Sequence, residues 1–153
     1  MWMKNCFTTQ VYSKFELPDF IAPQPRLTSK EDVIGSLVME TIWKTILWQQ
    51  FGAAIDMLEN GINACPSELW HVRLWDNHSA TTDSSEFWYI VYHTLFWLDL
   101  YLSGSIEGFV PPVPFTLDEL DPAGVFPERP YTKDELQTYL EHGRQSVRRR
   151  LKS

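Results

Sequence analysis

The feature of this sequence that most constrains its fold is an apolar run at residues 87–102, FWYIVYHTLFWLDLYL. It contains no Gly or Pro, and it carries one histidine, His93, and one acid, Asp99. A segment this apolar on every face is typical of a helix that other helices surround. It is shorter than the roughly 20 residues of a membrane-spanning helix, and charged groups are costly in lipid. We therefore predict a buried central helix and no membrane association. Why an imidazole lies within such a helix is the functional question that this sequence poses.

Capping signals place the starts of the helices. Thr28 and Glu31 fit a capping box, and apolar residues then recur at steps of three and four until Gly61, a natural helix stop. This pattern predicts an amphipathic helix of about 30 residues. Asp83 and Glu86 are spaced as the N-cap and third residue of the central helix.

A third helix follows a long connection. Thr132 and Glu135 form another capping box, and the apolar stripe after it ends near Leu151. Residues 105–130 contain six prolines, and residues 118–121 are expected to form one helical turn. Loops of this length are often functional or cover an opening.

Composition limits the classes of partner and compartment. The chain is one domain of 153 residues, which we divide into an arm at 1–27, punctuated by prolines, and a helical bundle domain at 28–153. The net charge of −7 disfavours nucleic acid, and the arginines near the C-terminus are read as a solvated helix face. Two cysteines and no signal-peptide run are typical of a cytoplasmic protein.

The remaining polar residues admit more than one interpretation. His71, Asp76 and His78 could form a metal site, but their spacing matches no compact zinc pattern and loop histidines are commonly solvated. His142 lies beside the third stripe and is read as a surface residue. Asp99 is expected to be more exposed than His93. For His93 itself, a hydrogen-bonded core histidine and a metal ligand both stay open.

Three helices with wide apolar stripes need another surface to cover them. A fourth helix of a bundle would supply it, or a second subunit would. We therefore predict an all-α, up-and-down helical bundle of three main helices, with the fourth absent or supplied by a partner in a homodimer.

Three segments together resemble a known family. They are WQQFGAAIDMLENGI, YIVYHTLFWLDLYLSG and PERPYTKDELQTYLEHGR, in that order. This chain resembles the DinB-like (DinB/YfiT) superfamily of four-helix bundles over residues 28–153. The resemblance implies a divalent metal, such as Zn or Ni, held by one histidine of the second helix and an H-x-x-x-H pair of the fourth.

His93 matches the ligand of the second helix, and the H-x-x-x-H pair has no counterpart in this sequence. Tyr89 and Trp97 share a helical face with His93 and are expected beside the metal pocket, with Trp48 and Phe51 as further candidates. A three-imidazole site with an open position activates water or a thiol.

Two classes of function follow from this pattern. The first, implied by the resemblance, is a metal-dependent enzyme of hydrolase or thiol-dependent transferase type, acting on an unidentified small molecule. The second is a non-catalytic helical-bundle module for binding or assembly, in which His93 is structural.

Overall fold

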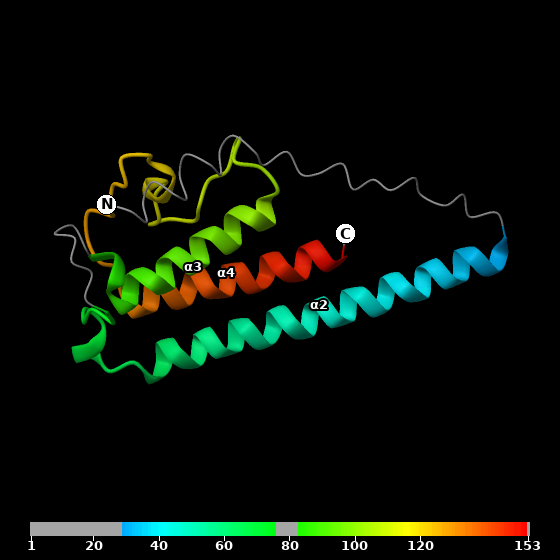
Figure 1. Cartoon of the computed structure of the whole chain (residues 1–153), viewed down its shortest axis with the longest axis horizontal. Coiled ribbons are helices and arrows are strands. Elements are labelled where there is room, and N and C mark those ends of the chain that lie inside the picture. Colours follow the sequence, from blue (N-terminus) through cyan, green and yellow to red (C-terminus); the bar gives the residue numbers. More distant parts are fainter. Residues whose placement is uncertain (1–28, 76–82, 153) are drawn as a thin grey trace. The chain divides into compact units, whose positions relative to one another are not determined.

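A computed structural model describes residues 29–75 and 83–152, which are mainly helical (Figure 1). The α-helices are α2 (Lys30–Ala64), α3 (Phe87–Ser103) and α4 (Lys133–Lys152). Single 3₁₀ turns lie in the connections: η1 (Ser67–Leu69), η2 (Asp83–Ser85) and η3 (Asp118–Leu120). Within these ranges, β pairing is limited to one isolated bridge between Arg73 and Glu86. The predicted all-α class is confirmed, whereas the predicted arm at 1–27 lies outside the described residues.

The chain divides into two compact units, Met1–Thr45 and Ile46–Ser153, and the hydrophobic core lies in the second unit. Of the helices in the described ranges, none combines the length and apolar character needed to cross a membrane.

Helix α2 begins one residue later than the capping-box prediction and ends later too. Ser29 Oγ accepts from the backbone N–H of Asp32 at 3.1 Å, and Asp32 Oδ2 accepts from the N–H of Ser29 at 3.1 Å. Gly61 does not end the helix, which continues to Ala64. A glycine inside a helix costs only about 1 kcal/mol, and the complete burial of Ile62 offsets that cost.

Helix α3 begins without the predicted side-chain cap. Asp83 belongs to η2, and Glu86 precedes the helix in an extended conformation with no capping hydrogen bond. A backbone carbonyl caps the first turn instead: the N–H of Trp88 donates to the carbonyl of Trp70 at 3.3 Å. At the other end Gly104 adopts a φ of 82°, the left-handed conformation expected at a helix end.

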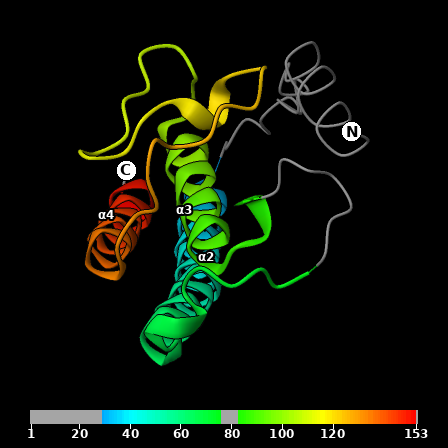
Figure 2. The same cartoon turned by 90° about the vertical axis from the view of Figure 1, so that its left-hand side faces the viewer.

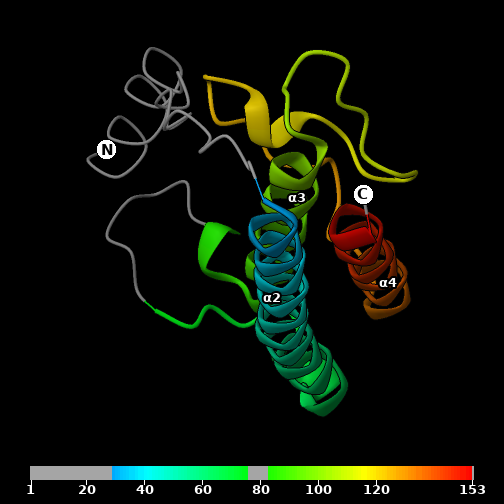
Figure 3. The same cartoon turned by 90° about the vertical axis from the view of Figure 1, so that its right-hand side faces the viewer.

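Helices α3 and α4 lie side by side and run in the same direction (Figures 1, 2 and 3). Near their starts Trp88 contacts Tyr131, with 6.1 Å between ring centroids. Near their ends Arg150 donates to the carbonyl of Ser103 at 2.8 Å. The expected up-and-down order is therefore not met between these two helices. The reason is the long connection 104–132, which returns the chain to the start of α3 before α4 begins.

The second half of α2 runs antiparallel to α4. Gln137 donates to Asn63 Oδ1 at 2.6 Å, and Arg144 Nη1 donates to Asp56 Oδ1 at 2.5 Å. The apolar stripe of α2 is buried only in this half, mainly at Ile55 and Ile62. The following apolar residues of its first half are exposed: Val33, Ile34, Leu37, Val38, Met39, Ile42 and Trp43.

The core of the second unit surrounds α3. Its members are mostly large apolar side chains: Ile55, Ile62, Trp70, Trp88, Val91, Tyr92, Leu95, Phe96, Leu100, Phe109, Phe115, Tyr131, Leu136, Tyr139, Leu140 and Val147. Asp99 is buried as well, at 7% exposure, so its predicted exposure is wrong. One face of α3 stays open, since Tyr101 is 62% exposed. The prediction of a helix surrounded on every side is therefore wrong for that face.

The connection 104–132 is held to this core at several points. Phe109 and Phe115 are buried in it, and η3 forms the predicted helical turn. At its end the predicted capping box of α4 is confirmed. Thr132 Oγ1 accepts from the N–H of Glu135 at 3.3 Å, and Glu135 Oε2 accepts from the N–H of Thr132 at 2.8 Å.

Candidate functional site

His93 lies on the open face of α3, between two aromatic rings of the same helix. The centroids of Tyr89 and Trp97 are each 6.1 Å from the imidazole centroid. Residues four apart on a helix are neighbours, so this arrangement follows from the sequence spacing. The row of rings continues to Tyr101, which lies 5.7 Å from Trp97.

Glu119 lies in η3 of the long connection, and its carboxylate contacts this row of rings at His93 and Trp97. Its Oε2 lies 2.7 Å from His93 Nδ1 and accepts from Trp97 Nε1 at 3.2 Å. The hydroxyl of Tyr89 donates to the same carboxylate. The side chain of Glu119 is 5% exposed, whereas that of His93 is 51% exposed. The connection thus places a buried carboxylate against one edge of a half-exposed imidazole.

The electrostatics of the cluster determine which group carries the proton. Burial by itself raises the pKa of Glu119, but hydrogen bonds from His93, Tyr89 and Trp97 outweigh burial, so the pKa lies below its ordinary value. The pKa of Tyr89 is raised, first by burial and then by the charge of Glu119. Glu119 is therefore ionised and accepts only, so His93 Nδ1 is the donor. In the neutral imidazole this leaves the lone pair on Nε2.

Metal-ligating histidines are often positioned by a contact of this kind. Such a histidine donates one ring N–H to a carboxylate or carbonyl, which fixes its tautomer and orientation and raises its basicity. The donor set is nevertheless incomplete, because the described residues contain no group of three His, Cys, Asp or Glu side chains that could hold a metal ion. They supply one ligand and its supporting carboxylate, which does not amount to a three-histidine site.

The other sequence candidates lie elsewhere. His71 Nδ1 is 3.6 Å from Glu86 Oε2, and the remaining residues of that predicted cluster, Asp76 and His78, lie outside the described residues. The ring of Trp48 lies under Arg148, at 5.0 Å. Phe51 is 39% exposed. In the described ranges, no hydrogen bond or ring contact joins Trp48 or Phe51 to His93.

Glu119 is the residue that sequence reasoning missed. It was placed in a helical turn, but no role was assigned to it, because its partner is 26 residues away on another element. The sequence feature that could have pointed to Glu119 is an acidic residue next to apolar residues, in a loop of a length that often covers an opening. His142, read as a surface residue, in fact contacts the buried Asp99, with Nε2 3.1 Å from Oδ1.

Comparison with known proteins adds no relative: no family model, no curated protein and no solved structure matches this chain.

Proposed function

We propose that this chain is a divalent-metal-binding protein of the DinB-like type, in which His93 supplies one imidazole ligand. The observation that carries the proposal is the 2.7 Å contact between His93 Nδ1 and the buried Glu119 carboxylate, which leaves Nε2 of the neutral imidazole as an acceptor. Imidazole ligands suit Zn or Ni. An activity of the hydrolase or thiol-dependent transferase type is part of the proposal, and no reaction step is assigned to an incomplete ligand set.

The test is a zinc titration of the purified chain against a chromophoric chelator. Wild-type protein is expected to compete for zinc, and His93→Ala is expected to lose that competition. Glu119→Gln should weaken zinc binding by about 10- to 100-fold, the usual effect of losing a supporting carboxylate. His71→Ala is the matched control and should bind as wild type does. Equal zinc binding by wild type and His93→Ala would sink the proposal.

A second function is favoured by the same contacts. Glu119 joins the long connection to α3 through three hydrogen-bond donors, so His93 can serve as a structural clamp in a binding or assembly module. The two functions differ in their response to zinc. A ligand that binds only the folded state raises the melting temperature. Zinc should raise it for wild type and not for His93→Ala, whereas a purely structural histidine gives no zinc response in either protein.

We also infer that a second copy of this chain covers the exposed apolar side chains of α2. The only charged residues between positions 33 and 55 are Glu40 and Lys44, and they pair with each other at 2.8 Å. An antiparallel two-fold pairing centred on Val38 sets Lys44 of each copy opposite Asp32 of the other. This pairing therefore places opposite charges at both ends of the apolar contact.

Light scattering after size exclusion should therefore give a dimer for wild type and a monomer for Leu37→Glu. Met57→Glu, at a 75% exposed position of the same helix, is the control and should stay dimeric. A monomeric wild type, or a dimeric Leu37→Glu, would contradict this pairing.

A further inference from the structure

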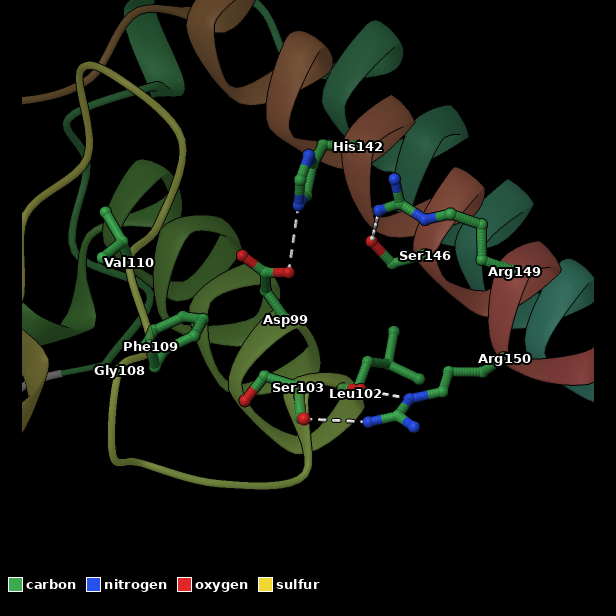
Figure 4. A pocket seen from close by; sticks show the side chains of 10 residues that line it. All are labelled: Asp99, Leu102, Ser103, Gly108, Phe109, Val110, His142, Ser146, Arg149 and Arg150. Atoms are coloured by element: carbon green, nitrogen blue, oxygen red, sulfur yellow. Dashed lines mark hydrogen bonds and ion pairs between the residues drawn. The ribbon is translucent and has the colours of Figure 1, made fainter. Parts of the chain in front are cut away.

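A pocket of about 490 Å³ lies between the second halves of α3 and α4 and the start of the long connection (Figure 4). Its volume is within the range of small-molecule sites. It is distinct from the His93 cluster, since neither His93 nor Glu119 lines it. It is lined at one side by Asp99 and His142 and at another by Arg149.

Arg149 brings an available cation to this pocket. In the described part of the chain its partner is Ser146, whose Oγ accepts from Nη2 at 2.9 Å. The other arginines of α4 are engaged: Arg144 with Asp56 and Glu59, Arg148 over the ring of Trp48, and Arg150 with the carbonyls of Leu102 and Ser103. A guanidinium has five N–H donors in a planar fork, so Arg149 retains donors that match a carboxylate.

The acidic residue of the pocket, Asp99, already has a polar partner at each carboxylate oxygen. Asp99 Oδ2 accepts from the hydroxyl of Tyr139 at 3.3 Å, and Oδ1 lies 3.1 Å from His142 Nε2. Two arginines against one carboxylate leave the lining net positive even when His142 is neutral. This balance favours an anion over a cation. The Asp99 charge also disfavours a dianion, because like charges repel.

The third part of the lining is apolar. Leu102, Phe109 and Val110 form it, and Val110 is 80% exposed, so an apolar ligand would remove its side chain from water. Pockets of this kind combine apolar walls with a few polar groups that fix orientation. We propose that this pocket binds a small monocarboxylate with an apolar tail, its carboxylate on Arg149 and Ser146 and its tail against the apolar wall.

Hexanoate is the probe, titrated into the full chain and followed by isothermal calorimetry. We expect saturable binding that is at least about tenfold weaker in Arg149→Met, because a charge-assisted pair is lost. Arg149→Lys should fall between them, since an ammonium keeps the charge but not the fork. Arg148→Met, at the neighbouring arginine over Trp48, is the matched control and should bind as wild type does.

A second variant keeps the test independent of any disturbance to α4. Val110→Asp changes an exposed wall residue and sets a negative charge beside the ligand, so it should also weaken hexanoate binding. Hexanol and hexylamine, which share the tail, should bind far more weakly than hexanoate. Wild-type protein that shows no saturable hexanoate binding, Arg149→Met that binds as wild type does, or hexanol that binds as well as hexanoate would each overturn the proposal.

Discussion

Phe96→Ala is expected to lower the free energy of unfolding by about 3–5 kcal/mol, the usual cost of removing a buried aromatic ring. Phe96 is 0% exposed. Its ring lies 6.0 Å from Tyr92 and 5.5 Å from Phe109, so it joins α3 to the long connection. Because a domain of this size is stable by only about 5–15 kcal/mol, one such cavity removes a large share of the total.

Urea denaturation followed by circular dichroism measures this loss as a lower transition midpoint. Tyr101→Ala is the matched control, an aromatic residue of the same helix that is 62% exposed. Its effect should stay within about 1 kcal/mol, as for most exposed positions. Similar midpoints for the two variants would show that Phe96 does not lie in the core described above.

Glu119→Gln is expected to cost about 1.5–3 kcal/mol, because hydrogen bonds to a buried charged acceptor are replaced by weaker ones to a neutral amide. The same substitution should change the dependence of stability on pH. The pKa of Glu119 is lower in the folded protein, so its contribution is complete above the unfolded pKa and is lost as pH falls through the folded one. Wild type should therefore lose stability below about pH 4.5 more steeply than Glu119→Gln.

Glu128→Gln serves as the control for that comparison, since Glu128 is an exposed acid of the same connection. Its urea midpoint should follow that of wild type at every pH. If Glu119→Gln and Glu128→Gln were equally stable at pH 7, the carboxylate of Glu119 would not be holding the connection to α3.

Local signals in the sequence predicted helices better than they predicted burial. The capping box at Thr132 and Glu135 is present because both residues lie within one helical turn, so their hydrogen bonds depend on local geometry alone. The cap predicted at Asp83 fails because the carbonyl of Trp70, from a distant segment, serves the first turn of α3 instead. Capping is therefore readable where it is local and not where tertiary contacts replace it.

Burial depends on which helices meet, and that information is not local. Asp99 was expected to be exposed from its angle on the helix, but α4 runs parallel to α3 and brings Tyr139 and His142 to its carboxylate. The first half of α2 has the apolar pattern of a buried helix, yet residues such as Leu37 are exposed. A pattern shows that a face can be buried, and it does not name what covers it.

Only the part of the candidate site that lies on α3 could be predicted from the sequence. Spacing along α3 identified Tyr89 and Trp97 as neighbours of His93, because one helix sets all three positions. Glu119 comes from a proline-rich connection whose path no periodicity describes, so its contact with His93 required the structure.

The most direct test of the central claim is the protonation state of the His93 imidazole. Two-dimensional ¹⁵N–¹H spectra of the rings at pH 8, assigned with His93→Ala, report which nitrogen carries the proton. Contact with Glu119 predicts the proton on Nδ1 and a bare Nε2, whose resonance shifts when zinc is added. A His93 ring protonated on Nε2, with no response to zinc, would contradict a metal ligand positioned by Glu119.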